Sequence, residues 1–151
     1  MSLGIDFSGL PWVIFDLDGT LADIKHRLPE IRAGRYNDSM DKISGDTLKG
    51  DIYCIYDMAA DGGYNVAIVT GRSEIYKQPT IDWLRKNKVT FDSLHMRGKS
   101  DFRSDDEVKL DIYLDNFKDK DVRFVVDDRD KVVAMWRSLG LTCLQCQDGD
   151  Y

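Results

Sequence analysis

Two carboxylates follow an apolar run near the start of the chain, and their spacing suits a nucleophile paired with a proton carrier. Residues 12–15 are typical of a buried strand, Asp16 and Asp18 come directly after them, and Gly19 allows a turn. In an extended backbone, side chains at positions i and i+2 point the same way. One carboxylate can then attack phosphorus while the other handles a proton, if their pKa values are pushed apart. The alternative is a solvated Asp-Gly turn, which the apolar run in front of it disfavours.

A second group of residues can bind the phosphoryl group. Phosphate-monoester hydrolysis is among the slowest reactions in water, and its catalysts place positive charge and hydrogen-bond donors around the phosphate oxygens. Thr70, Gly71 and Arg72 provide a hydroxyl, a backbone amide and a guanidinium after a second apolar run. Lys109 is predicted in the first turn of a helix, off its core face, where an ammonium can bind an anion. Taken alone, Lys109 would be interpreted as an ordinary surface lysine.

The pair Asp127-Asp128 ends a third apolar run and predicts a metal site. Clustered carboxylates repel each other, and a proton or a cation relieves the repulsion. Mg²⁺ prefers octahedral oxygen coordination, which carboxylates, carbonyls, waters and a substrate phosphate can provide. The alternative for this pair is an exposed acidic turn before Arg129.

Other catalytic classes find little support in the sequence. His26 and His95 are the only histidines, and nothing pairs them, which argues against histidine catalysis and a histidine-rich zinc site. There is no Gly-x-Ser-x-Gly elbow and no P-loop of the kinase type. Cys143 and Cys146 have a C-x-x-C spacing, but residues three apart in a strand point to opposite faces, so core packing is the better interpretation.

The candidate residues follow strands that a parallel sheet would bring together. Apolar runs rich in β-branched and aromatic residues alternate with helical periods, which predicts an α/β fold with a doubly wound, mostly parallel sheet flanked by helices. In such sheets ligands bind beyond the carboxyl ends of the strands. Asp16, Thr70 and Asp127 are therefore expected to meet at one edge. The runs predicted as strands are residues 12–15, 66–69 and 124–126 and, with weaker patterns, 142–146 and 93–96.

Apolar stripes at helical spacing lie between these runs. Gly62-Gly63 and Gly140 end the first and last stripes, residues 104–107 form a capping box before the middle one, and Pro79 suits the first turn of a further helix. The three stripes are Ile52, Ile55, Tyr56 and Ala59; Leu110, Tyr113, Leu114 and Phe117; and Val132, Met135, Trp136 and Leu139.

The length and composition fit a single domain over residues 1–151, with residues 22–48 as a small lid or substrate-facing loop. A net charge of -6 argues against binding along an extended nucleic acid duplex, although a few arginines can still bind the end of a nucleic acid strand. No apolar run is long enough to cross a bilayer, and Met1 to Gly9 lacks the pattern of a secretory signal. Three cysteines indicate a reducing compartment. The chain is therefore expected to be soluble and cytoplasmic.

These motifs, in this order, resemble the haloacid dehalogenase superfamily. Within it, nearly the whole chain is similar to the 3′-phosphatase domain of phage polynucleotide kinase–phosphatase, here without the kinase domain. The similarity is most specific in residues 125–137 and in the ending Gln147-Asp148-Gly149-Asp150-Tyr151. The four motifs of the superfamily match Asp16-Leu-Asp-Gly-Thr-Leu21, Thr70-Gly71-Arg72, Lys109 and Asp127-Asp128.

The resemblance implies a role for each motif residue. Asp16 would be the nucleophile, and Asp18 would protonate the leaving 3′ oxygen and later activate water. Mg²⁺ would be held by Asp16, the backbone carbonyl of Asp18 and Asp128, with Asp127 close by. The other implied roles are phosphate binding by Thr70 and Lys109, positioning of Lys109 by Asp105, and contacts at the substrate end by Arg27 and Arg72.

The resulting hypothesis is a Mg²⁺-dependent polynucleotide 3′-phosphatase that acts on DNA or RNA ends, with a kinase or ligase supplied by another chain as a possible partner. A phosphatase of nucleotides or other small phosphomonoesters would share every catalytic residue and stays open as the alternative. Two further classes fit the pattern less well: a phospho-accepting signalling receiver, in which the acidic pair would come first, and a catalytically inactive partner-binding domain.

Overall fold

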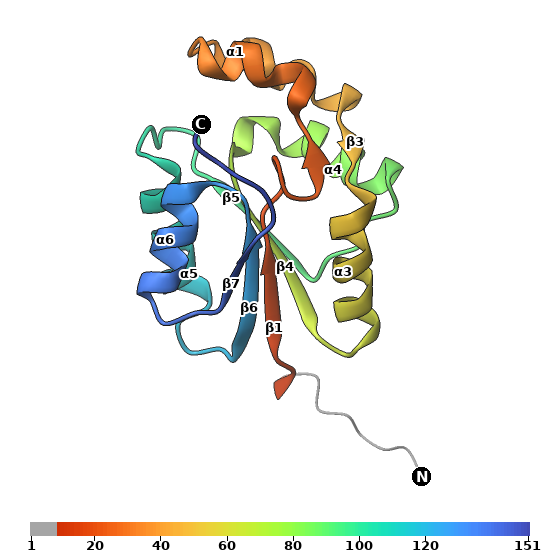
Figure 1. Ribbon diagram of the computed structural model, residues 1–151, viewed down its shortest axis with the longest axis vertical. Coiled ribbons are helices and arrows are strands. Elements are labelled where there is room, and N and C mark those ends of the chain that lie inside the picture. The colour runs from red at the N-terminus through yellow and green to blue at the C-terminus, as the bar shows by residue number, and fades with distance from the viewer. Residues whose placement is uncertain (1–8) are drawn as a thin grey trace.

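The central sheet has five parallel strands in the order β5-β4-β1-β6-β7, so the first strand of the chain lies in the middle (Figure 1). The computed structural model describes residues 9–151, and residues 1–8, where no secretory signal is predicted, lie outside the described residues. The α/β fold expected from the sequence is confirmed. The strands are β1 (Trp12–Phe15), β4 (Asn65–Ser73), β5 (Ser93–Arg97), β6 (Val122–Asp127) and β7 (Cys143–Gln145).

Four helices cover the two faces of this sheet. Side chains of a strand alternate between faces, so Val13 and Phe15 join the core under α3 (Gly50–Asp61) and α4 (Lys77–Lys86). Ile14, between them, packs on the other face with α5 and α6, as Figure 1 shows. These two helices are α5 (Asp105–Asn116) and α6 (Asp130–Ser138). Because both faces are buried, the strands need continuous apolar sequence, and this is the pattern that predicted them.

The helix boundaries agree with the predicted caps, but in two helices one residue of the predicted apolar stripe is exposed. The capping box before α5 is present, with the Ser104 amide donating to Glu107 at 3.2 Å. Along α5, however, Val108 and Lys109 are buried, whereas Leu114 is 42% exposed. Ile55 of α3 is likewise 39% exposed. The expectation that Lys109 lies off the core face of its helix is therefore wrong, because α5 directs that side chain inward.

Residues 22–48 fold into short elements, which we call the cap. It lies beyond the carboxyl ends of the strands, where α1 stands above the sheet in Figure 1. The buried side chains of Ile24, Met40 and Ile43 fix the cap to the core of the α3 side. Its elements are the antiparallel pair β2 (Ala22–Asp23) and β3 (Thr47–Leu48), the helices α1 (Leu28–Arg32) and α2 (Tyr36–Met40), and the 3-10 turns Lys25–Arg27 and Ile43–Gly45.

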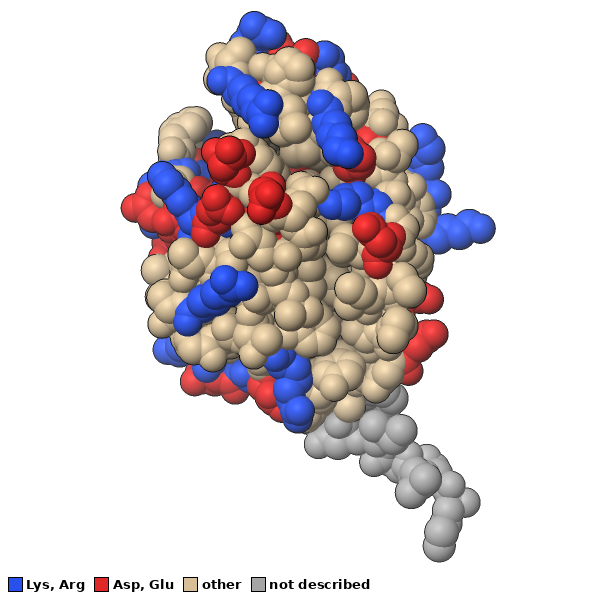
Figure 2. Space-filling model, viewed as in Figure 1, with Lys and Arg blue, Asp and Glu red and all other residues tan. Residues whose placement is uncertain are grey.

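The surface carries charges of both signs in mixture. On the face that Figure 2 shows, Lys and Arg side chains are spaced among acidic and uncharged ones instead of forming a continuous basic stripe. Within residues 9–151, the helices are too short and too polar to cross a membrane.

Candidate active site

Three buried aspartates meet where β1 and β6 end. One carboxylate oxygen from each of Asp16, Asp127 and Asp128 lies within 4.8 Å of the others. The side chains converge because β1 and β6 are parallel neighbours, with Phe15 paired to Val126, so both strands end at the same level. The expected meeting of these motifs at one sheet edge is thus seen directly.

Lys109 provides the cation of this cluster. Its Nζ lies 2.9 Å from Oδ1 of Asp16 and 2.7 Å from Oδ2 of Asp127, and its side chain is 2% exposed. Asp127 is further fixed by the indole of Trp136, which donates to Oδ2 at 3.2 Å, and by the Asp128 amide, which donates to Oδ1 at 2.8 Å. Lys109 is thereby held between the first and last acidic motifs.

The carboxyl-terminal segment holds Asp128. Oδ2 of this carboxylate accepts hydrogen bonds from the Tyr151 hydroxyl and, at 3.2 Å, from the Gln147 amide. Gly19 lies against the same group: a Cβ at that position would stand 2.2 Å from Oδ2 of Asp128. Gly19 also has a φ of +81°, so both its backbone and its surroundings require glycine.

Asp18 belongs to a separate network of two arginines and a second aspartate. Arg27 donates to Oδ1 of Asp18 at 2.6 Å, and Arg72 contacts both oxygens, at 3.0 Å for Oδ2 through Nε. Both guanidiniums also bind Asp46 of the cap, at 2.7 and 3.2 Å. Arg27 and Arg72 are fully buried, so the contacts expected at the substrate end are instead contacts to carboxylates. Two arginines and two aspartates balance in charge, which permits their burial.

The environments of Asp16 and Asp18 drive their pKa values in opposite directions. Burial and the charge of Asp127 raise the pKa of Asp16 well above its usual range, against the opposing influence of Lys109. Burial also acts to raise the pKa of Asp18, but the charges of Arg72 and Arg27 outweigh it and hold that pKa well below its usual range. The two carboxylates of one short motif are therefore electrostatically distinct.

The phosphate-binding candidates Thr70 and Gly71 lie near the carboxyl end of β4, the neighbour of β1 in the sheet. The Thr70 hydroxyl accepts from the Arg72 amide at 3.2 Å. Gly71 abuts Asp105, because a Cβ there would stand 2.6 Å from its Oδ1. Asp105 pairs with two further arginines, Arg97 and Arg129, as their side chains converge on it.

Asp105 has no hydrogen bond or ion pair with Lys109 among the described residues, although the sequence suggested that it positions this lysine. Its charge does act on Lys109: with Asp127 and Asp16, it raises the pKa of that ammonium against the effect of burial. The influence of Asp105 on Lys109 is therefore electrostatic.

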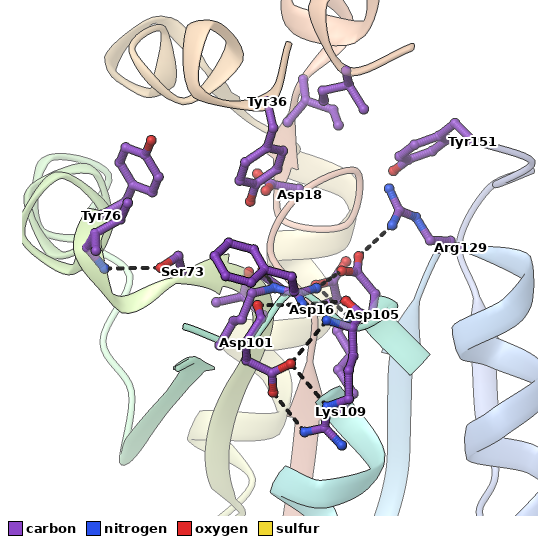
Figure 3. Close-up of a pocket in the computed structure, with 18 of the residues that line it drawn as sticks. Asp16, Asp18, Tyr36, Ser73, Tyr76, Asp101, Asp105, Lys109, Arg129 and Tyr151 are labelled. Atoms are coloured by element: carbon purple, nitrogen blue, oxygen red, sulfur yellow. Dashed lines mark hydrogen bonds and ion pairs between the residues drawn. The ribbon is translucent and has the colours of Figure 1, made fainter. Parts of the chain in front are cut away.

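Asp16, Asp18 and Lys109 line one cavity of about 370 Å³, which Arg27 and Arg72 do not line. Figure 3 shows Asp16 and Lys109 on its floor, Tyr36 pointing down from the cap over Asp18, and Arg129 and Tyr151 on one side. Thr70, Gly71, Ser73 and the three clustered aspartates also line it. The floor is acidic and the surrounding donors are cationic or hydroxylic, which suits a metal–phosphate ligand.

The acidic cluster fits a hard divalent cation. Three carboxylates face a single ammonium, so negative charge is left in excess, and burial raises the pKa of Asp128 as well as that of Asp16. The donors are all oxygens, which matches Mg²⁺ better than softer metals. The side chain of Asp18 is hydrogen-bonded to Arg27 and Arg72. Its backbone carbonyl is therefore the group of Asp18 that can bind the metal ion, as the resemblance implies.

Sequence reasoning missed four residues that organise the site. Asp46 lies in the polar cap and Arg97 stands alone after a weak strand, so neither carries a pattern that could reveal it. Gln147 and Tyr151 fall in the ending that supports the family resemblance, but nothing in their types predicts contacts to Asp128. Only Tyr151, an aromatic residue in a polar ending, offers a weak signal.

Sequence comparison agrees with the geometry. Residues 11–151 match the family described as the polynucleotide kinase PNKP phosphatase domain. A protein of Autographa californica nuclear polyhedrosis virus, provisionally named a bifunctional polynucleotide kinase/RNA ligase, is 32% identical over 130 residues. This match covers 84% of the chain but only 18% of the viral protein.

Solved structures give the same result. A chain in the structure of the Pnkp1/Rnl/Hen1 RNA repair complex superposes with a TM-score of 0.84 and 36% identity, over 94% of this chain and 44% of that one. A haloacid dehalogenase-like hydrolase from Streptococcus pneumoniae, 14% identical, shares the fold with a TM-score of 0.61, over 91% of this chain and 85% of that one. The resemblance seen in the motifs is confirmed: the chain belongs to the polynucleotide kinase phosphatase-domain family of haloacid dehalogenase-like proteins.

Proposed function

We propose that the chain is a Mg²⁺-dependent polynucleotide 3′-phosphatase that works through an aspartyl-phosphate on Asp16. One observation carries the proposal: Asp16 lies 2.9 Å from a buried Lys109 and beside Asp127 and Asp128, while Asp18 stands apart in an arginine network. A nucleophile, a cation site and a separate proton carrier are thus combined in one cavity. Family membership supports the polynucleotide end as the substrate.

The first step forms a bond between a carboxylate oxygen of Asp16 and phosphorus, and the bond from phosphorus to the 3′ oxygen breaks. Asp18 gives its proton to the leaving oxygen. The negative phosphate that enters the cavity raises the pKa of Asp18, because like charges disfavour ionisation, and this opposes the two arginines.

In the second step Asp18, now a carboxylate, accepts a proton from water. The water oxygen bonds to phosphorus, the bond to Asp16 breaks and inorganic phosphate leaves. Lys109, Thr70 and the Gly71 amide donate to phosphate oxygens throughout. Mg²⁺, held by Asp16, Asp128 and the Asp18 carbonyl, would neutralise charge on the phosphate.

Asp18→Asn is expected to slow hydrolysis of esters with poor leaving groups by about 10²- to 10⁴-fold, because no acid protonates the departing oxygen. A nitrophenyl phosphate, whose leaving group is stable as an anion, should be much less affected in the step that forms the phosphoenzyme. The measurement is the ratio of single-turnover rates on the two esters, in which any loss of folded protein cancels. Equal losses on both esters would count against the proton-carrier role.

Removal of divalent metal with EDTA is expected to silence the enzyme, and added Mg²⁺ should restore it. Because the pKa values of Asp16 and Asp128 are raised, protons compete with the cation, and the Mg²⁺ concentration for half activity should increase as the pH falls. Titrations of activity at two pH values measure this shift. Thermal unfolding with and without Mg²⁺ gives an independent reading, since a bound cation should raise the Tm. Full activity in EDTA would overturn the metal assignment.

The polynucleotide assignment is tested by comparing 3′- and 5′-phosphorylated oligonucleotides with mononucleotides and an aryl phosphate. We expect kcat/KM to be highest for the 3′-phosphorylated oligonucleotide, with Asp16→Asn as the inactive control. Equal or better use of the small esters would instead support the alternative phosphatase of nucleotides or other small phosphomonoesters.

A kinase or ligase that works with this phosphatase is part of the proposal. The chain spans less than half of the chain it matches in the RNA repair complex, and less than a fifth of the viral relative. The name of the viral relative joins a polynucleotide kinase to an RNA ligase, and the matched structure is that of the Pnkp1/Rnl/Hen1 RNA repair complex. Kinase and ligase steps on the same nucleic acid ends would therefore come from other protein segments.

A further inference from the structure

The most exposed large hydrophobic side chain in residues 9–151 stands at the mouth of the cavity. Phe102 is 92% exposed, yet it lines the same cavity as Asp16 and Lys109. An aromatic ring in this position makes almost no contribution to the core. Its hydrophobic surface is available to a ligand whose phosphate is bound below.

The segment that carries Phe102, residues 97–103, is held by hydrogen bonds, and we call it the lip. Arg97 donates to the carbonyls of Asp101 and Arg103, at 3.2 and 2.5 Å. The Asp101 amide donates to the Gly98 carbonyl at 3.1 Å, and the Arg103 amide donates to Oδ1 of Asp101 at 3.1 Å. Phe102 is therefore presented at the apex of an ordered loop.

The lip is also tied to the phosphate-binding side of the site. Nε of Arg97 donates to the Gly71 carbonyl at 2.8 Å, and the same guanidinium pairs with Asp105. The guanidinium of Arg97 therefore links the residues on either side of Phe102 to Gly71, one of the phosphate-binding candidates. This arrangement suits a ligand in which a planar apolar group and a phosphate are joined by a spacer of fixed length, as base and 3′-phosphate are joined through ribose.

One cation of the lip is available to a ligand. Arg103 is paired with Asp101 and Asp111, and Arg97 with Asp105. Lys99 is exposed, lines the cavity and forms no ion pair in the described part of the chain. A free ammonium at the cavity mouth can bind the next phosphate of a strand that leaves the site.

We propose that the lip is the nucleotide-binding subsite: Phe102 stacks on the base of the 3′-terminal nucleotide, and Lys99 pairs with the adjoining backbone phosphate. This inference rests on the proposed function and names the groups that would distinguish a polynucleotide end from a simple phosphomonoester. Stacking on an aromatic side chain accepts any base, so the subsite would select a nucleotide without selecting its sequence.

The test compares three substrates: a 3′-phosphorylated oligonucleotide, the same oligonucleotide with an abasic terminal residue, and a nucleoside 3′-monophosphate. Phe102→Ala should lower kcat/KM by about 5- to 100-fold on the two substrates that carry a terminal base. The abasic substrate should lose much less, and Phe102→Trp should restore the difference. Met58→Ala, which truncates another exposed apolar side chain on α3, is the matched control.

Lys99→Gln should weaken binding of the oligonucleotides and leave binding of the mononucleotide unchanged. For a single strand, it should also lower the slope of log KM against log salt by about 0.7. If Phe102→Ala affects abasic and base-bearing substrates equally, the stacking assignment is wrong. Failure of the proposed function would give a different result from failure of the stacking assignment. If the proposed function is wrong, the wild type will not prefer the oligonucleotide to the mononucleotide, even if Phe102→Ala still lowers kcat/KM on both base-bearing substrates.

Discussion

Asp16→Asn is expected to lower kcat by about 10⁴-fold or more while the protein stays folded, because an amide cannot form the covalent bond to phosphorus. The fold should tolerate the change well. Asp16 is buried in an acidic cluster that raises its pKa, so loss of its charge relieves repulsion, and the amide oxygen can still accept from Lys109. The Tm of the variant should therefore equal or exceed that of the wild type in the absence of metal.

Rapid quenching of the wild type with a labelled 3′-phosphate should trap label on the protein, in a form that hydroxylamine releases, and the variant should trap none. Asp57→Asn, a charge-matched change on the exposed side of α3, controls for the loss of one carboxylate. Turnover by Asp16→Asn within tenfold of the wild type would refute the nucleophile assignment.

Lys109→Met is expected to abolish most activity and to destabilise the fold by about 3 kcal/mol, because in the described part of the chain Lys109 is the cation that forms ion pairs with the buried aspartate cluster. In a domain of this size such a loss corresponds to a Tm that is lower by roughly 6–12 °C. Added Mg²⁺ should recover part of the stability by replacing the missing positive charge. Lys86→Met, at an exposed position of α4, should leave both activity and Tm close to those of the wild type.

The destabilisation should also depend on pH in a defined direction. Without Lys109, the pKa of Asp16 in the folded state rises further above that of the unfolded chain. The folded state then binds more protons than the unfolded state, so the stability of the variant decreases as the pH increases through this range. Its Tm should lie closest to that of the wild type at low pH. A deficit that is constant from pH 5 to pH 8 would show that Lys109 acts through packing and not through charge.

Most of the fold was predictable because its signals are local or follow general topological rules. Continuous apolar runs such as residues 66–69 predict strands buried on both faces, and β4 contains this run. The capping box at residues 104–107 marks the start of α5 correctly. The faces of helices were harder: Leu114 and Ile55 have suitable spacing but are exposed, because a stripe specifies its own helix and not the rotation of that helix against the sheet.

By itself, the sequence determined the fold class and the family, and it predicted which candidate residues meet at the strand ends. Asp16, Thr70 and Asp127 each follow an apolar run directly, and parallel strands end together, so local pattern and topology suffice to bring them to one edge. The network around Asp18 depended on the tertiary structure. Asp46 approaches Arg72 only because the cap packs over the sheet, and Arg97 joins Gly71 to Asp105 across sequence separations that no local pattern records. The ends of the strands position the candidate catalytic aspartates. The charged residues that pair with them lie on other segments, and the packing of those segments against the sheet decides where they lie.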